Sequence, residues 1–237
     1  MRNILYIMIA VILSACDKES ITESSILSEE IPKVKTATYD STVLSYTYDA
    51  RGRQLTCNNS DGIKRVYAYP MGSIKESIYK NGVLEYFYKN DLNADSLCIR
   101  EVKSNDLSYD QLYQYNPDRT MAKVITKKNG SIIQLMDFFY SNGNCDSVRF
   151  IINGQWMQTI IKTYYTDRSN VLSPEIFGNE YYGKGSMNLL KSETFVYAGC
   201  SPEPSTNYSY EYNVLGRVVK EVVTKGNYIT IGLYTYY

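Results

Sequence analysis

The chain contains 237 residues, in which 25 lysines and arginines balance 25 aspartates and glutamates, and it contains no histidine. Zero formal charge excludes the basic surface that binds a nucleic-acid backbone, so no nucleic-acid partner is expected. The lack of histidine removes the usual general base and a common zinc ligand. An apolar fraction of 44% is sufficient for a folded core.

The N-terminal residues have the pattern of a secretory signal peptide. Arg2 precedes an uncharged apolar run from Ile4 to Leu13, which is too short to span a bilayer comfortably. The sequence Leu13-Ser14-Ala15-Cys16 resembles the lipobox of bacterial lipoproteins, in which the cysteine becomes the lipidated first residue after cleavage. We therefore expect a signal peptide at residues 1–15 and attachment to a membrane through a lipid on Cys16. The polar residues 16–35 are expected to form a flexible tether.

From residue 36 to residue 237, tyrosine-rich alternating runs recur on both sides of short turns. In Tyr46-Thr47-Tyr48-Asp49-Ala50-Arg51-Gly52-Arg53, alternation places the tyrosines on one strand face, Asp49 can accept backbone hydrogen bonds, and Gly52 can close the turn. A second copy starts at Tyr210, and several Asn-Gly pairs between the runs are typical of hairpins. The pattern predicts a single all-β domain, an antiparallel meander of about fourteen strands.

A long meander must protect its edges, and closure into a barrel or a strongly curled sheet is the simplest solution. A β-solenoid and an open twisted sheet are the alternatives. Tyrosine suits each of these folds, because its ring packs on a pleated face while its hydroxyl remains hydrated. We expect Arg53 and Arg217, which each begin a return strand, to lie over tyrosines of the paired strand.

The regular pattern is interrupted at residues 166–190, where Pro174 and several glycines predict a long loop. Ser186 could cap one helical turn in this segment. Since loops commonly carry function, Tyr181 and Tyr182 are candidate ligand-binding residues that could form a sugar-stacking platform with Trp156, the only tryptophan, although a lone tryptophan in a strand more often packs in the core or at the rim.

The lipobox, the tether, the repeated Tyr-x-Tyr-Asp-x-x-Gly-Arg hairpins and the segment Gly183–Leu190 together resemble a Bacteroidetes lipoprotein family of unassigned function with a porin-like fold. The resemblance covers residues 36–237, and it implies a porin-like barrel in the cell envelope. A porin-like fold suggests a barrel that spans the membrane, but we do not expect one, because the pairs Lys64-Arg65 and Lys220-Glu221 place charge on both faces of their strands.

Few residues suggest chemistry. Apart from Cys16, the cysteines are widely separated, so they predict either two disulfides or isolated buried side chains: Cys57, Cys98, Cys145 and Cys200. No metal site and no cofactor are expected, because no Cys-x-x-Cys pair and no histidine are present. A Ser-His-Asp triad is also excluded, which leaves carboxylate-pair or lysine chemistry as the ordinary enzymatic routes.

Three Asp-Ser-x segments resemble a short O-glycosylation motif of exported Bacteroidetes proteins, and their acceptors would be Ser41, Ser96 and Ser147. Ordinary turn and strand-start residues are the alternative. The sequence as a whole predicts a lipid-anchored protein of the outer membrane without catalysis, which binds a glycan or an envelope protein or acts as a scaffold. A carboxylate-dependent glycan-active enzyme and a purely structural lipoprotein are the alternatives.

Overall fold

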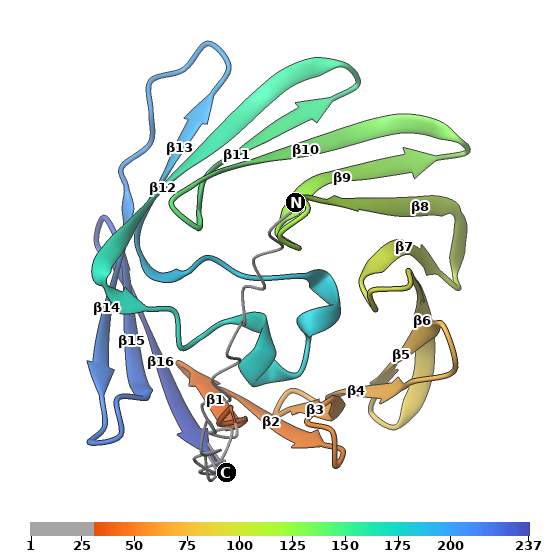
Figure 1. Cartoon of the computed structure of the whole chain (residues 1–237), viewed down its shortest axis with the longest axis horizontal. Helices are drawn as coiled ribbons and strands as arrows, with labels where there is room; N and C mark the ends of the chain where they lie inside the picture. Colours follow the sequence, from red (N-terminus) through yellow and green to blue (C-terminus); the bar gives the residue numbers. More distant parts are fainter. Residues whose placement is uncertain (1–30) are drawn as a thin grey trace, which may run out of the picture. The chain divides into compact units, whose positions relative to one another are not determined.

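The computed structural model describes residues 31–237, which form one closed barrel of antiparallel strands (Figure 1). Every strand pairs with its neighbour in sequence, and β1 pairs with β16 to close the ring. The strands are β1 (Val34–Tyr39), β2 (Thr42–Tyr48), β3 (Gln54–Asn59), β4 (Ile63–Ala68), β5 (Ser73–Lys80), β6 (Val83–Leu92), β7 (Cys98–Lys103), β8 (Asp106–Tyr115), β9 (Met121–Lys128), β10 (Ser131–Ser141), β11 (Asn144–Ile152), β12 (Gln155–Ser169), β13 (Asn188–Tyr197), β14 (Thr206–Tyr212), β15 (Val218–Lys225) and β16 (Tyr228–Tyr236).

The all-β antiparallel barrel predicted from the sequence is confirmed, whereas the solenoid and the open sheet are excluded by the β1–β16 pairing. The structure has sixteen strands instead of about fourteen. Four of its turns, at Asp40-Ser41, residues 93–97, Ser104-Asn105 and residues 116–120, contain no glycine. Strands counted from glycine-containing turns are therefore too few.

The barrel begins earlier in the chain than expected. Strand β1 starts at Val34, whose side chain is fully buried, so the last residues assigned to the tether belong to the sheet. The predicted signal peptide, the lipidation site Cys16 and most of the tether lie outside the described residues. The predicted loop is also shorter than residues 166–190, because β12 continues to Ser169 and β13 starts at Asn188.

The two ends of the barrel differ. One end, which we call the terminal end, contains the start of β1, the end of β16 and the segment between β12 and β13. The opposite end, the hairpin end, contains mostly two-residue turns such as Asn81-Gly82 and Asn129-Gly130. The asparagines of these turns have positive φ, as the hairpin geometry requires.

The outer wall of the barrel combines polar side chains with exposed apolar ones such as Phe139, Ile161 and Leu233. Hydroxyl groups pair across neighbouring strands at Thr36–Thr235 (2.7 Å), Thr47–Thr56 (2.8 Å) and Thr163–Ser192 (2.7 Å). Ion pairs on the outer wall join Lys89 to Asp91, Arg100 to Asp110, Lys123 to Asp137 and Lys220 to Glu211. Exposed hydroxyl pairs and charged side chains are suited to contact with water.

Near the terminal end, several tyrosine hydroxyls donate to main-chain carbonyl groups inside the barrel, and five of them form what we call the tyrosine belt. The donor and acceptor residues of this tyrosine belt are Tyr48 and Val34, Tyr69 and Gln54, Tyr115 and Cys98, Tyr164 and Cys145, and Tyr236 and Val218, at 2.6 to 2.8 Å. Each acceptor residue is buried and lies at a register shift, where the regular ladder is interrupted. The belt therefore satisfies buried carbonyls that the shifts leave without a ladder partner.

Most turns at the terminal end contain the acidic or amide residue expected from the repeat, although the turn of residues 69–72 has none. Asp49 Oδ1 accepts from the main-chain nitrogens of Arg51 and Arg53, each at 2.9 Å. Arg53 stacks on Tyr69, with 4.1 Å between the guanidinium carbon and the ring centroid. Arg217 likewise lies over Tyr236, at 5.6 Å. Each arginine therefore covers a tyrosine that comes later in the sequence. Neither covers a tyrosine of the strand that precedes it in its hairpin.

The four cysteines within the described residues are free, so the isolated-side-chain alternative is correct. Cys57, Cys98 and Cys145 are buried, whereas Cys200 is exposed. Burial raises the pKa of the Cys98 thiol to about 12 and also raises the pKa of Cys57 and Cys145. Burial keeps reagents away from these three thiols, and the raised pKa lowers the fraction of thiolate, which is the reactive form.

We therefore expect a small alkylating reagent at pH 8 to modify Cys200 at least tenfold faster than the three buried cysteines in the native protein. Peptide mapping by mass spectrometry measures each rate separately, and denaturation before labelling should make the four rates similar. A mass lower by two hydrogens that reduction restores would indicate a disulfide, and that result, or equal rates in the native state, would contradict this assignment.

Candidate functional site

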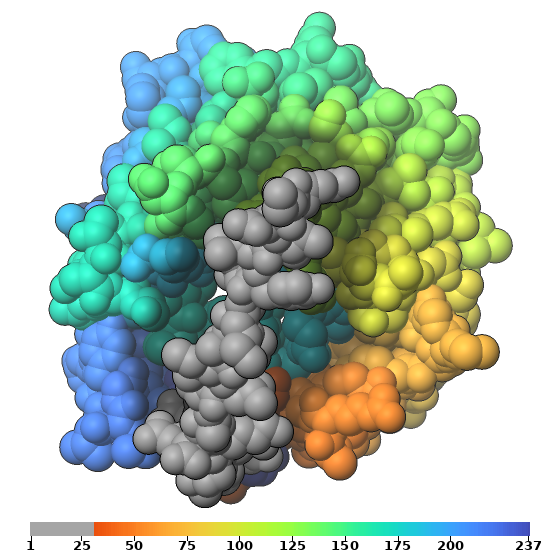
Figure 2. All heavy atoms as spheres, in the orientation of Figure 1, coloured from red at the N-terminus to blue at the C-terminus, as the bar shows by residue number. Residues whose placement is uncertain are grey.

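Residues 170–187 connect β12 to β13 by passing inside the ring of strands, which places this lumen loop within the barrel (Figure 1). The space-filling view shows its teal atoms recessed behind the rim (Figure 2). The loop contains two single 3₁₀ turns, η1 (Pro174–Phe177) and η2 (Glu180–Tyr182). The helical turn expected at Ser186 is wrong, because its hydroxyl bonds to Tyr164 and to the Cys145 nitrogen of the wall instead.

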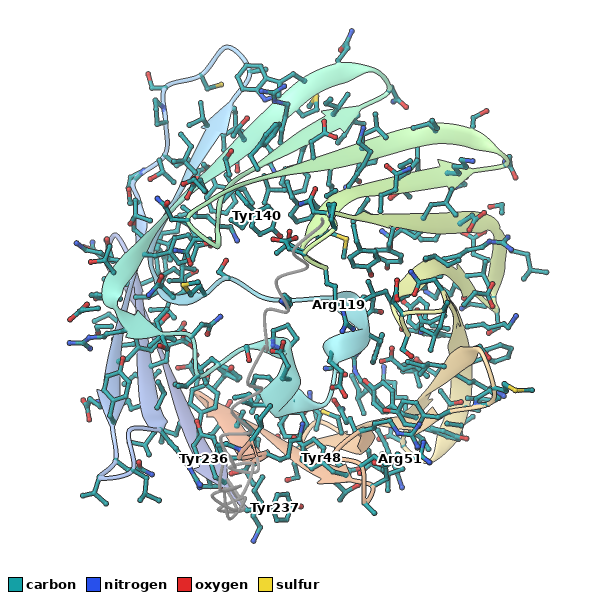
Figure 3. The ribbon with its side chains drawn as sticks, in the orientation of Figure 1. Tyr48, Arg51, Arg119, Tyr140, Tyr236 and Tyr237 are labelled. Atoms are coloured by element: carbon teal, nitrogen blue, oxygen red, sulfur yellow. The ribbon has the colours of Figure 1, made fainter. Side chains whose placement is uncertain are left out.

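Two glycines hold the lumen loop directly against the backbone of the wall. A Cβ atom on Gly178 would lie 2.6 Å from the main-chain nitrogen of Gln54. A Cβ atom on Gly183 would lie 2.4 Å from the carbonyl oxygen of Arg119, the residue labelled beside the loop in Figure 3. Neither position has room for a side chain, so glycine permits this close approach.

Hydrogen bonds fix the loop at several further points. The Lys184 nitrogen donates to the Arg119 carbonyl (3.0 Å), and the Met187 nitrogen donates to the Gly143 carbonyl (2.9 Å). At the start of β13, the amides of Asn144 and Asn188 bond to each other at 3.0 Å. The loop is consequently bound to wall segments that are far apart in sequence.

The predicted platform of Trp156, Tyr181 and Tyr182 is not formed. Tyr181 and Tyr182 are in η2, where their ring centroids are 4.5 Å apart and Tyr182 packs on Tyr113. Trp156 is instead on the outer wall near the hairpin end, 42% exposed, where its indole nitrogen donates to Thr159 (3.0 Å). The rim alternative considered for Trp156 fits this position. A register shift between β11 and β12 pairs Trp156 with Ile151, so Trp156 faces outward, away from the lumen loop, although it lies two residues before the inward-facing Gln158.

One lumen cavity lies between the loop and strands β2 to β4. It measures about 350 Å³, and we name it the Gln54 cavity after its most buried amide. Its lining residues are Leu44, Tyr46, Gln54, Cys57, Asn59, Ile63, Arg65, Tyr67, Phe177 and Asn179. The volume is within the range of about 300–1,000 Å³ that is usual for small-molecule sites.

The second cavity, the Glu221 cavity, lies between the other side of the loop and strands β12 to β15. It measures about 220 Å³ and is lined in part by Lys162, Tyr164, Tyr210 and Glu221. A third, shallow cavity of about 380 Å³ on the outer wall includes Trp156 and Arg149. The Gln54 and Glu221 cavities were not predicted, because their walls are residues that meet only through the path of the loop.

Four glutamates point into the barrel, and each accepts a hydrogen bond from a tyrosine hydroxyl. The donor and acceptor pairs are Tyr67 and Glu76 (3.1 Å), Tyr182 and Glu101 (3.0 Å), Tyr208 and Glu193 (2.9 Å), and Tyr234 and Glu221 (2.9 Å). Arg65 and Lys162 form ion pairs with Glu76 and Glu193, respectively. Burial raises the pKa of Glu101 and of Glu221, and in both cases a tyrosine donor partly offsets the effect.

Glu221 makes the stability dependent on pH in a defined direction. Since its pKa in the folded protein is above the usual 4.5, the folded state binds a proton more tightly than the unfolded state. The stability that Glu221 contributes through this tighter proton binding is fully present below pH 4.5. It is lost as the pH rises through the folded pKa of Glu221. Glu221→Gln should therefore gain stability relative to the parent protein between pH 4 and pH 7, as measured by urea unfolding. Glu85→Gln, an exposed change, controls for the loss of one charge, and an equal gain in both variants would contradict the role of burial.

The predicted O-glycosylation acceptors occupy different environments. Ser41 and Ser96 are exposed in turns, whereas Ser147 is partly buried within β11. Asp40 and Ser96 have positive φ, which is typical of turn residues. Glycosylation at these positions stays a prediction, and a glycan-specific mass shift that disappears in Ser41→Ala, Ser96→Ala and Ser147→Ala would support it.

Residues 31–237 contain no grouping of three or more acidic or cysteine side chains arranged to hold a metal ion. Within the same residues, no helix has the length and apolar character needed to cross a membrane.

Comparison with known proteins gives a structural relative only. No protein-family model matches the chain, and no curated protein matches it. The barrel is similar to the crystal structure of a porin-like protein from Bacteroides uniformis, determined at 2.32 Å resolution, with a TM-score of 0.65. The match covers 86% of this chain and 98% of that chain at 14% sequence identity, so it establishes a porin-like fold and no more.

Proposed function

We propose that the protein is a lipid-anchored, non-catalytic binding module of the cell envelope, and that it binds a glycan inside its barrel. The observation that carries the proposal is the lumen loop, which is fixed to the wall at Gly178 and Gly183 and leaves cavities on both of its sides. A loop fixed in this way provides a preorganised binding surface, which reduces the entropy lost on binding.

The outer wall supports a barrel surrounded by water. A lysine or arginine that faces lipid at the bilayer midplane costs about 2–4 kcal/mol, and the outer wall contains several, including Lys89, Arg100 and Lys123. Strands such as β1 and β3, with 6 residues each, are shorter than the about 9–11 residues that a spanning strand needs. Attachment to the outer membrane is therefore assigned to the lipid on Cys16.

The anchor is tested with the Cys16→Ser variant of the full chain in a Gram-negative host that processes lipoproteins. We expect the parent protein in the membrane fraction and the variant in the soluble envelope fraction after carbonate washing. Retention of the variant in the washed membranes would show that the barrel itself inserts into the bilayer and would overturn the assignment.

The binding role is tested by a thermal-shift screen of the full chain, purified in detergent, against host and dietary glycans with and without calcium. A ligand at 100 times its Kd stabilises a protein by about 2.7 kcal/mol, which such a screen detects. We expect a saturable rise in Tm for at least one glycan. A flat response to all glycans would refute glycan binding.

A carboxylate-dependent glycan-active enzyme is the alternative that the raised pKa of Glu101 favours. Such an enzyme requires two acids that face one cleft. Among the three cavities described above, Glu221 is the single acidic lining residue, while Glu76 and Glu101 are engaged by Arg65 and Tyr182. Binding without hydrolysis is consequently the function that this arrangement supports best.

A further inference from the structure

The Gln54 cavity contains two side-chain amides with unsatisfied polar atoms. Gln54 is 2% exposed, and within residues 31–237 its Oε1 atom has no hydrogen-bond partner. The Oδ1 atom of Asn179 is likewise buried without a partner. The close contact of Gly178 with the Gln54 backbone brings these two amides together. Buried polar groups without partners are rare and destabilising, so their presence requires an explanation.

The remaining lining residues indicate which ligand would satisfy these amides. Tyr46 and Phe177 form an aromatic wall, with ring centroids 5.7 Å apart and an interplanar angle of 61°. Arg65 also lines the cavity; its side chain is half-exposed, and its charge is neutralised by Glu76 at 2.8 Å. An anionic ligand would therefore find no unpaired cation in this cavity, and a purely apolar ligand would leave the amides of Gln54 and Asn179 unsatisfied.

We propose that the Gln54 cavity is a binding site for one neutral sugar unit, whose hydroxyl groups bond to the amides of Gln54 and Asn179 and whose apolar face packs on Tyr46 and Phe177. Hydroxyl groups both donate and accept, and rotation of an amide about its last side-chain bond exchanges its oxygen and nitrogen. Each amide can therefore present either atom to the sugar. This site rests on the proposed function, for which it specifies the ligand class and the residues.

Cys57 provides a local reporter, since its thiol lines the same cavity and is free. The full chain is incubated with a small neutral alkylating reagent in the presence and absence of neutral mono- and disaccharides, and each cysteine is quantified by peptide mapping. A sugar that raises Tm should slow modification of Cys57 at least fivefold, while the exposed Cys200 and the distant Cys145 react at unchanged rates.

Affinity of the same saccharide for variants gives an independent readout. Gln54→Met retains the approximate size of the side chain without its amide, and Asn179→Leu does the same in the loop. Each is expected to weaken binding about tenfold, the usual effect of one lost hydrogen bond. Gln158→Met, a lumen amide of β12 outside the three cavities, is the matched control and should bind as the parent protein does.

The outcomes separate the site from the general function. A saccharide that raises Tm without protecting Cys57, or that binds Gln54→Met as tightly as the parent protein, overturns the proposed site and leaves glycan binding intact. The absence of any thermal shift overturns glycan binding and this site together. Protection of Cys57 in the parent protein supports the site even if a variant fails to fold.

Discussion

Replacement of Gly183 by alanine is expected to lower the free energy of unfolding by about 3–5 kcal/mol. Gly183 has φ +86° and ψ −170°, a region that glycine alone adopts readily. Its added Cβ would also approach the Arg119 carbonyl oxygen to 2.4 Å and the Tyr115 ring to 2.9 Å. Because backbone lies on both sides of this contact, relief requires the lumen loop to move away from the wall.

Urea unfolding measures this loss, and Gly82→Ala is the matched control. Gly82 has a similar φ of +82°, but a Cβ there meets no atom within 4 Å. The control should lose about 1 kcal/mol, the conformational cost alone. Equal losses in the two variants would show that the contact between the loop and Arg119 contributes nothing.

Removal of three belt hydroxyls is the second large effect. In the triple variant Tyr48→Phe, Tyr115→Phe and Tyr164→Phe, three buried carbonyl groups lose their donors while the aromatic rings remain. Each loss costs about 1–2 kcal/mol, and the sites are in separate strands, so the triple variant should lose about 3–6 kcal/mol.

Tyr228→Phe controls for loss of a hydroxyl as such, since Tyr228 is 84% exposed. This control should change the unfolding free energy by less than about 0.5 kcal/mol. A triple variant as stable as the control would mean that water satisfies the carbonyls of the belt equally well. Tyr48 and Tyr236 lie close to the chain end at Tyr237 (Figure 3), so the belt also contributes to the region where the barrel closes.

The sequence was sufficient to predict the barrel because the signals for it are local. Alternating tyrosines define strand faces, and residues such as Asp49 and Asn81 define turns over a few positions. One turn shows the limit of this reasoning. Lys89 follows Tyr88 where Asp49 follows Tyr48 in the first copy of the repeat, but β6 continues to Leu92, and Asn93 Oδ1 accepts from the main-chain nitrogens of Asp95 and Leu97.

The candidate site could not be predicted in the same way. Whether residues 170–187 extend into solvent or fold into the barrel depends on contacts such as that of Gly183 with Arg119, which no local pattern encodes. Gln54 has the appearance of an ordinary residue at the start of a strand, and its partner Asn179 is far away in sequence. Pairing Trp156 with Tyr181 failed for the same reason, since Trp156 faces outward through a register shift between β11 and β12 that no local pattern encodes.

The central claim is that the lumen loop is a fixed wall of the binding cavities, and hydrogen exchange of its main-chain amides tests this most directly. The Lys184 and Met187 amides donate to the carbonyls of Arg119 and Gly143 across the barrel. In the full chain without ligand, we predict that both amides exchange as slowly as those in the middle of β12. Exchange at the rate of unprotected turn amides would show that the loop leaves the wall readily, and it would contradict a preformed site.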